Sequence, residues 1–297
     1  MQYSISDLEQ LSGIQSHTIR IWEQRYNALN PHRSAGNTRY YDEKQLLRLL
    51  NIVSISKQGL KISKICSLSD EAIHQLIEQE ITSTISDNLD YEFYISKLLN
   101  YGIVYDELNF NRLLNQCFVK YDVSISYQFI IYPLLVRLGL MWRKDSICAA
   151  QEHFLTHLIR QKLFVAIENL PIVKTNQTWL LFLPQEEEHE MGLLYANYVL
   201  RRLKQKVIYL GAKVPLQSVD QVIQSNQIHH MLIFLVHPNL VANTQVYIDQ
   251  LANKYSHIAI HLAGNQQLLA NLKLPANITL FRSIEQFELL IQSTNLC

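Results

Sequence analysis

The chain has 297 residues, too many for one small domain and enough for two or three domains with cores of their own. Hydrophobic residues make up 48% and charged residues 18%, a composition that excludes an intrinsically disordered chain. The start MQYSISDLEQ lacks the features of a signal peptide, and no apolar stretch predicts a membrane span. We therefore expect a cytoplasmic protein without a membrane partner. The four scattered cysteines form no C-x-x-C pair, which argues against a disulfide framework and a zinc site.

The formal net charge is zero, but this average hides a basic segment near the N-terminus. Between residues 12 and 64 the acidic residues are only Glu23, Asp42 and Glu43. The basic residues of the same segment are Arg20, Arg25, Arg33, Arg39, Lys44, Arg48, Lys57, Lys61 and Lys64. Local positive charge of this kind is typical of a surface that contacts nucleic acid.

Turn and cap signals divide this basic segment into short elements. Residues 5–11 predict a helix that ends near Gly13, and Ser16 is a candidate N-cap for a second helix over residues 17–26. Two short helices joined by a glycine-containing turn predict a helix-turn-helix. The following NPHRSAGNTRYYDEKQ predicts a β-wing, and Asp42 is a candidate cap for a third helix to about Ser56. We expect a winged helix-turn-helix over residues 1–70.

Two further domains follow. Apolar residues recur at helical spacing in ELNFNRLLNQCFVKY and YQFIIYPLLVRLGLMW, which predicts a four-helix bundle over residues 71–172. Beyond Pro171, short apolar runs such as WLLFLP, KVIYLG and MLIFLV alternate with helical segments. This alternation predicts a parallel, doubly wound, Rossmann-like α/β domain over residues 173–297.

The second helix and the wing carry the side chains expected to contact DNA. The N-terminal end of a recognition helix meets base edges, and wing side chains contact the phosphates that fix its register. The plain alternative is a charged helix that only faces solvent, whereas Ile19 and Trp22 are expected to face the core. The candidate DNA-binding residues are Gln15, His17, Thr18, Arg20, Arg25, Arg33, Asn37, Arg39 and Tyr40.

The first quarter of the chain, from YSISDLEQLSGIQSHTIRIWEQRY to RLLNIV, resembles the DNA-binding domain of the MerR family of transcriptional regulators. The resemblance implies binding to double-stranded operator DNA. Metal-sensing members of that family carry cysteine ligands after a long dimerisation helix. Neither feature is evident in this sequence, so a metal sensor is not expected.

A second motif, Glu187-x-His189-x-x-Gly192, directly follows the first predicted strand of the α/β domain. The carboxyl end of such a strand is where open α/β sheets bind ligands, and a histidine there can ligate a metal while a carboxylate orients its ring. Taken alone, an acidic residue and a histidine at a helix start are most often a cap. The motif resembles the Asp-x-His-x-x-Gly signature of cobalamin-binding domains. This resemblance implies that His189 ligates cobalt from below, with Glu187 orienting it.

The segment MWRKDSICAAQEH places Trp142 at a fixed interval before Glu152 and His153. This arrangement is similar to that of cobalamin-dependent photoreceptor repressors of the CarH/LitR type, in which these residues of the helical bundle cover the upper face of the corrin. The resemblance implies that the chain holds adenosylcobalamin or methylcobalamin between the bundle and the α/β domain, with Gly264 close to the nucleotide tail. Taken alone, Trp142 would be bundle core and His153 a hydrogen-bonded polar residue.

Three positions depart from the pattern of that family. Leu235 or Val236 ends the third strand of the α/β domain where a serine is usual, which removes a hydroxyl. The pair Ala263-Gly264 replaces a Gly-Gly pair, which adds a methyl group. Arg143 stands beside the tryptophan where light-sensing members carry a histidine that ligates cobalt after illumination. An altered or lost cofactor, and an altered response to light, stay open.

The leading hypothesis is a transcriptional repressor, not an enzyme, whose self-association as a dimer or tetramer and whose DNA binding are gated by cobalamin. Several DNA-binding domains on one assembly would gain affinity through effective concentration. A first rival keeps DNA binding and gives the C-terminal domain a cofactor-free interaction role. A second rival is a corrinoid-carrying methyltransferase subunit, because those proteins share the bundle and α/β arrangement. The fused helix-turn-helix argues against this second rival.

Overall fold

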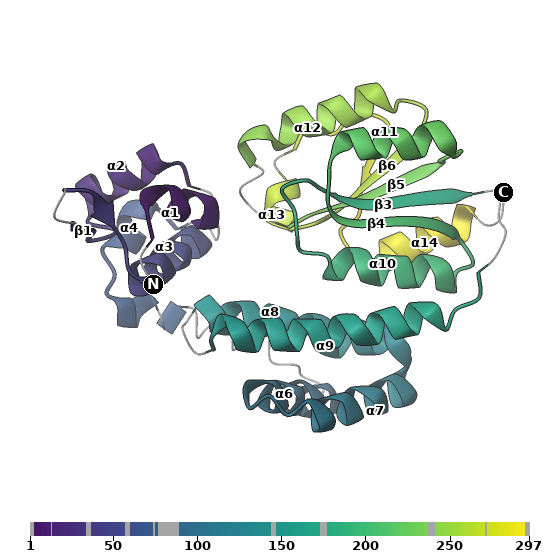
Figure 1. Ribbon diagram of the computed structural model, residues 1–297, viewed down its shortest axis with the longest axis horizontal. Helices are drawn as coiled ribbons and strands as arrows, with labels where there is room; N and C mark the ends of the chain where they lie inside the picture. Colours follow the sequence, from purple (N-terminus) through teal and green to yellow (C-terminus); the bar gives the residue numbers. More distant parts are fainter. Residues whose placement is uncertain are drawn as a thin grey trace. The chain divides into compact units, whose positions relative to one another are not determined.

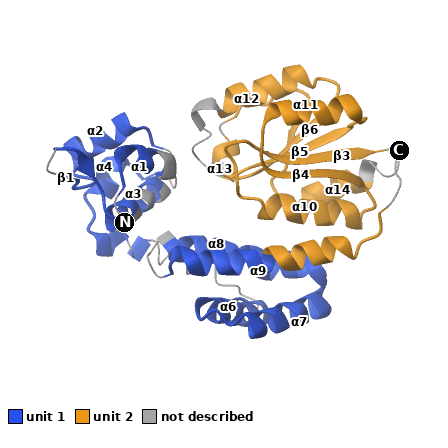
Figure 2. Cartoon of the chain, in the orientation of Figure 1, with its two compact units in different colours: residues 1–159 blue, residues 160–297 orange. Residues whose placement is uncertain are grey.

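The structure is a computed structural model, in which contacts divide the chain into two compact units, residues 1–159 and residues 160–297 (Figure 2). The division falls inside one helix, and the boundaries expected at residues 70 and 172 stay predictions. The described residues are 3–12, 14–33, 37–56, 60–73, 75–76, 89–143, 147–172, 177–236, 241–270 and 272–294.

The first unit begins with the predicted winged helix-turn-helix. Ile19, which was expected to face the core, is fully buried, and Trp22 packs against the same core. Gly13, predicted to end the first helix, lies outside the described residues. The two short strands pair antiparallel as the wing. The elements are α1 (Ile5–Ser12), α2 (Ser16–Tyr26), β1 (His32–Arg33), β2 (Arg39–Tyr40), α3 (Glu43–Ser56) and α4 (Ile62–Cys66).

The helix ends in this domain confirm one predicted cap and correct another. Asp42 caps α3, because its Oδ1 accepts from the Gln45 N–H at 2.9 Å while Gln45 Oε1 accepts from the Asp42 N–H at 3.2 Å. The prediction that Ser16 caps α2 is wrong, because α2 begins at Ser16 and Gln15 is its N-cap. The carboxylate of Glu9 in α1 accepts from the Ser16 N–H at 3.1 Å and from its hydroxyl, which joins the two helices.

The predicted bundle consists of α6 (Leu89–Ile103), α7 (Glu107–Ser126), α8 (Tyr132–Arg143) and α9 (Ala149–Glu168), with the π-helix η1 (Tyr127–Ile131) between α7 and α8. Asp122 breaks α7 into two helices, because its φ of 63° and ψ of 175° are not helical. Its Oδ1 accepts from the Ile125 N–H at 2.9 Å and caps the second part. The second part continues through η1 into α8, so the described residues of the bundle form the four helices that the sequence predicts.

One stretch of the bundle, Glu107–Trp142, is long and apolar enough to cross a membrane by length and composition alone. This finding corrects the expectation that the chain has no such stretch. Half of its most apolar window is buried inside the protein. Its Arg137 is also buried and donates to both carboxylate oxygens of Glu92, at 2.7 and 2.9 Å. The buried half of this window belongs to the core of the bundle, whereas other large apolar side chains of the stretch, such as Leu108 and Val119, are exposed.

The second unit contains the predicted parallel α/β domain. Its strands are β3 (Thr178–Pro184), β4 (Lys206–Val214), β5 (His230–Leu235), β6 (Ala259–Gly264) and β7 (Ile278–Leu280). They form one parallel sheet in the order β4-β3-β5-β6-β7. Figure 1 shows α11 and α12 on one face of the sheet and α10 and α14 on the other. The helices are α10 (Met191–Arg202), α11 (Leu216–Ser225), α12 (Val241–Lys254), α13 (Gln266–Leu269) and α14 (Ile284–Thr294).

The chain order reverses at β3, which pairs with β4 on one side and with β5 on the other. Open α/β sheets bind ligands at such a switch point, outside the carboxyl ends of the strands. All seven residues of β3 are buried because helices cover both faces of the sheet. The loop that leaves β3 carries Glu187 and His189. The sheet therefore places the second motif at its topological switch point.

Candidate functional site

The helix α2 presents most of the side chains that we expect at base edges. Gln15, His17, Arg20 and Arg25 are exposed, and Thr18 is half-buried. His17 and Arg20 are three residues apart, so they lie on the same side of the helix. The buried side of α2 packs in the core of the domain, which leaves these polar and basic groups at the surface.

The wing brings the other four predicted residues together. Arg33 in β1 pairs in register with Arg39 in β2, and Arg33 Nη1 donates to Asn37 Oδ1 at 2.6 Å. Tyr40 stacks on His32 with ring centroids 5.2 Å apart. Arg33 and Asn37 are exposed, whereas Arg39 and Tyr40 are half-buried. The wing therefore carries two arginines on adjacent strands.

Glu23 and Tyr41, which sequence reasoning missed, connect α2 to the base of the wing. Tyr41 is fully buried, and its hydroxyl donates to Glu23 Oε1 at 2.6 Å. Burial, and then the bond to Glu23, raise the pKa of the Tyr41 hydroxyl, so it stays protonated and donates. The signal available in the sequence was one acidic residue inside a basic helix.

Glu187 is the centre of a hydrogen-bond network at the switch point. Its side chain is fully buried, and Oε1 accepts from the N–H groups of Glu188 and His189, each at 3.0 Å. The same oxygen lies 2.6 Å from His189 Nδ1. The other oxygen, Oε2, accepts from the Val236 N–H at 2.8 Å, directly after β5. The buried carboxylate thus joins the two loops that flank the switch point.

This network fixes the orientation and tautomer of His189. An ionised carboxylate only accepts hydrogen bonds, so the ring donates through Nδ1 and a neutral ring carries its lone pair on Nε2. Half of the His189 side chain is exposed. A carboxylate behind a half-exposed histidine is the arrangement that orients metal-ligating imidazoles. The geometry therefore suits a histidine ligand for a cation held outside the sheet.

The two predicted glycines, Gly192 and Gly264, allow close packing inside the α/β domain. A Cβ atom on Gly192 would lie 2.5 Å from Cε1 of Phe234. A Cβ atom on Gly264 would lie 2.2 Å from the carbonyl oxygen of Leu235, and its φ of 128° is in the region that favours glycine. Leu235 itself is buried in the core of the domain. Packing alone therefore requires both glycines.

Trp142, Glu152 and His153 all belong to the first unit. Trp142 is half-buried near the end of α8, and the side chain of Arg143 lies outside the described residues. Glu152 and His153 are in the first turn of α9, where Glu152 Oε2 lies 3.2 Å from His153 Nδ1. The His153 side chain is 70% exposed. The two predicted Glu/His pairs are therefore each in contact. Glu152 and His153 meet in the first unit, and Glu187 and His189 meet in the second.

A bare metal ion has no complete site in the part of the chain that the structure describes. No group of three or more His, Cys, Asp or Glu side chains there could hold one. Cys66 and Cys117 are buried thiols, Cys148 is an exposed thiol, and Cys297 lies outside the described residues. A ligand at His189 would have to bring further donors of its own.

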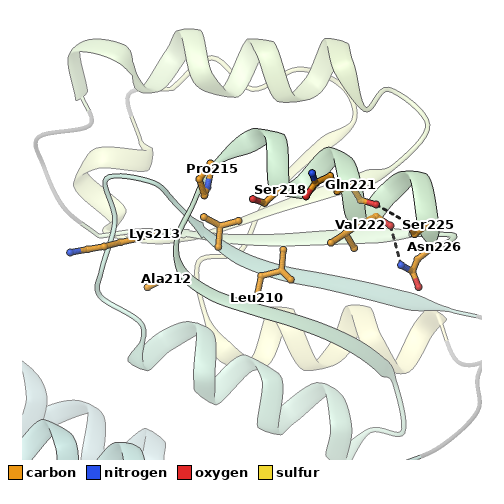
Figure 3. A pocket seen from close by; sticks show the side chains of 10 residues that line it. Leu210, Ala212, Lys213, Pro215, Ser218, Gln221, Val222, Ser225 and Asn226 are labelled. Atoms are coloured by element: carbon orange, nitrogen blue, oxygen red, sulfur yellow. Dashed lines mark hydrogen bonds between the residues drawn. The ribbon is translucent and has the colours of Figure 1, made fainter.

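A cleft of about 550 Å³ lies between the edge strand β4 and α11 (Figure 3). None of the predicted site residues lines it. Lys213, which lines the cleft, also contacts the loop after β3. Its N–H donates to the Glu187 carbonyl at 3.2 Å, and its Nζ lies 2.6 Å from Glu188 Oε2. Its lining residues are Leu210, Ala212, Lys213, Val214, Pro215, Ser218, Gln221, Val222, Ser225 and Asn226.

The chain is similar to a known family near its N-terminus and to two named repressors over most of its length. Residues 3–71 match the family described as MerR HTH family regulatory protein. The HTH-type transcriptional repressor CarA of Myxococcus xanthus is 30% identical over 223 residues, 74% of this chain and 72% of CarA. The repressor CarH of the same organism is 26% identical over 223 residues, 74% of each chain.

Two thirds of the chain also resembles a protein of known structure, since the match covers 67% of it. The monomethylamine corrinoid protein of Methanosarcina barkeri superposes with a TM-score of 0.55, at 10% identity, over 67% of this chain and 96% of that chain. At this identity the likeness shows a shared fold. The chain therefore belongs to the MerR family of helix-turn-helix transcriptional regulators, in the group that includes CarA and CarH, and has a C-terminal region with the fold of a corrinoid protein.

Proposed function

We propose that this regulator is a cytoplasmic repressor whose binding to double-stranded operator DNA is controlled by a cobalamin at His189. The observation that carries the cofactor claim is the buried Glu187 carboxylate 2.6 Å from His189 Nδ1 at the switch point. The exposed basic side chains of α2 and the wing support the DNA claim. The similarity to two proteins named as repressors supports the sign of regulation.

The residues around His189 fit a lower ligand for cobalamin. A single histidine is too few donors for a bare ion, but it would suffice for a metal that arrives in a cofactor with donors of its own. Glu187 and His189 would hold the cobalt, and Trp142, Glu152 and His153 of the bundle would cover the cofactor. When bound, the cobalamin would supply a cobalt ion with an organic upper ligand that light can remove.

The DNA contacts proposed for Arg20 and Arg39 predict a measurable salt dependence. Each neutralised phosphate releases condensed counterions, so Arg20→Ala or Arg39→Ala should weaken binding and lower the salt slope by about 0.9 for each phosphate that the arginine no longer neutralises. The measurement is fluorescence anisotropy of the intact protein on duplex DNA from its own promoter region at several salt concentrations. Absent or salt-independent binding would contradict the DNA claim.

Control by cobalamin would act through self-association. Several DNA-binding domains on one dimer or tetramer reach neighbouring half-sites with higher effective concentration than a single domain. A ligand can shift such an assembly only if it binds one state more tightly than the other. We therefore propose that the cobalamin-bound chain is the state that associates and represses.

A cofactor-free version of the same regulator is the main alternative. Leu235 is buried in the core at the carboxyl end of β5, and Gly264 lies against its carbonyl oxygen, so both positions serve packing. In that alternative, the Glu187 network would only stabilise the loop after β3. A corrinoid methyltransferase subunit, favoured by the shared fold, is a second alternative. Methyl transfer from a loaded protein that does not bind its promoter would support it.

The experiment that separates these functions is the visible spectrum of purified protein after incubation in the dark with adenosylcobalamin or methylcobalamin. After desalting, the proposal expects wild type to retain the cofactor and His189→Ala to lose it or to show a changed spectrum. Affinity should also fall in acid, because a protonated imidazole offers no lone pair to a metal. Equal retention and equal spectra in the two proteins would contradict the assignment of His189.

A further inference from the structure

A buried carboxylate lies beside the arginines that we expect at the DNA. The Glu23 side chain is 7% exposed, although it belongs to the recognition helix α2. Its Oε1 accepts from the hydroxyl of Tyr41, and its Oε2 lies 3.8 Å from Arg39 Nε in the wing. Arg20 precedes Glu23 by three residues on α2, and its charge also acts on Tyr41. One carboxylate therefore contacts the base of the wing and one of its arginines.

Simple electrostatics does not explain an acidic residue at this place. A buried charge costs free energy unless partners compensate it. Negative charge near the DNA-binding side also opposes the approach of phosphates. Within the residues described, no hydrogen-bond acceptor reaches the buried Nε of Arg39, so Glu23 is the countercharge beside it. The benefit that offsets these costs must come from what the carboxylate holds in place.

We propose that Glu23 is a positioning residue for DNA recognition, which holds Arg39 and the base of the wing at Tyr41 in a fixed place relative to the recognition helix. This inference rests on the proposed DNA binding by α2 and the wing. A long arginine side chain that is already ordered loses less conformational entropy when it meets a phosphate. The wing and the helix then engage the duplex as one preformed surface.

The test is Glu23→Gln in the full chain, because the sign of its effect separates positioning from charge. The amide keeps an acceptor for Tyr41 but loses the negative charge beside Arg39. Charge alone predicts tighter DNA binding by the variant, since the protein becomes more positive. Positioning predicts weaker binding by about tenfold. The reason is that Arg39 would no longer be held in place for its charged hydrogen bond to a DNA phosphate. The exposed Glu71 gives a matched control, because Glu71→Gln makes the same chemical change at an exposed position that follows α4 in the chain.

The measurement is anisotropy on a labelled mixed-sequence duplex over a range of salt concentrations. Phosphate contacts carry no sequence information, so a known operator is not needed. Glu23→Gln should also lower the salt slope, by up to about 0.9 if Arg39 no longer reaches its phosphate. In an Arg39→Ala background the further effect of Glu23→Gln should be small, because the group that it positions is gone.

Three results would overturn the inference while wild type still binds DNA. Glu23→Gln could bind DNA as tightly as Glu71→Gln or more tightly, it could keep the full salt slope, or its loss of affinity could be undiminished in the Arg39→Ala background. The last result would mean that Glu23 acts by a route other than Arg39, and thermal unfolding of each variant reports whether that route is a general loss of fold. Failure of wild type itself to bind duplex DNA would instead contradict the proposed function on which the inference rests.

Discussion

Glu187 Oε1 lies 2.6 Å from His189 Nδ1, while Oε2 of the same carboxylate accepts from the Val236 N–H, 49 residues further along the chain. One side chain thus ties the candidate ligand to the carboxyl ends of β3 and β5, the two strands at the switch point. The position of His189 depends on the integrity of this network, and its removal should affect stability as well as ligand binding.

Glu187→Gln tests the network. An amide offers one acceptor oxygen, whereas the carboxylate offers two. The NH₂ group of the amide would face backbone N–H groups whose hydrogen bonds the carboxylate now accepts. A buried donor without a partner costs about 1–3 kcal/mol, so we expect a loss of that size in the free energy of unfolding by urea. The control is Glu188→Gln, whose exposed side chain pairs with Lys213 at the surface. Surface pairs contribute about 0–1 kcal/mol, so equal losses in the two variants would contradict the network.

Gly264→Ala tests the close approach of β6 to the end of β5. The added Cβ would lie 2.2 Å from the Leu235 carbonyl oxygen at a φ of 128°. Backbone strain and overlap together should cost about 2 kcal/mol or more. Gly139 in α8 has no atom within 4 Å of a built Cβ, so Gly139→Ala should stabilise the bundle by about 0.5–1 kcal/mol. Urea unfolding measures both changes, and a harmless Gly264→Ala would refute this packing.

The stability of the α/β domain should fall in acid because of His261. Burial, and then the charge of His230, lower the pKa of His261 to about 3. In the unfolded chain His261 binds a proton at about pH 6.5, whereas in the folded domain it does so only at about pH 3. The stability that comes from keeping His261 neutral is therefore complete above pH 6.5 and is lost as the pH falls toward 3. The expected slope is about 1.4 kcal/mol per pH unit for this group. His261→Phe keeps an aromatic ring beside Trp179 and Phe281 and should flatten the profile measured by urea unfolding. A profile that keeps its full slope in the variant would rule out this group as the cause.

Arg143, at the end of α8, should weaken retention of the cofactor after illumination. A guanidinium stays protonated at physiological pH and offers no lone pair to a metal. We expect protein loaded in the dark and then illuminated to lose cobalamin on a desalting column more readily than Arg143→His treated in the same way. Dark samples of both proteins serve as controls. Equal retention of cobalamin by wild type and Arg143→His after illumination would show that position 143 does not decide how firmly the cofactor is held.

Local patterns in the sequence predicted the elements because each pattern has a local cause. The apolar run of β3 follows from burial on both faces, and the cap at Asp42 follows from a residue pair three positions apart. The cap at Ser16 was predicted wrongly because α2 begins at Ser16 itself, with Gln15 as its N-cap, and the Ser16 hydroxyl donates to Glu9, seven residues away. The break at Asp122 was not visible because the apolar periodicity continues on both sides of it.

The candidate site was predictable only in part. The Glu187 and His189 pair is close in sequence, so its contact could be expected from the motif. The bonds from Glu187 to Val236 and from Glu23 to Tyr41 join segments 49 and 18 residues apart. Tertiary packing alone creates such contacts, so the sequence could single out Glu23 as an acidic residue in a basic helix but could not identify its partner.

Cobalamin-dependent DNA binding is the measurement that tests the central claim most directly. Wild type and His189→Ala are each titrated onto labelled DNA from the promoter region, in the dark, with and without adenosylcobalamin, while the visible spectrum reports loading. We predict that the cofactor strengthens DNA binding by wild type and leaves His189→Ala unchanged, because that variant lacks the proposed ligand. Loading that leaves the DNA affinity of wild type unchanged, or an equal gain in both proteins, would contradict control of this regulator by a cobalamin at His189.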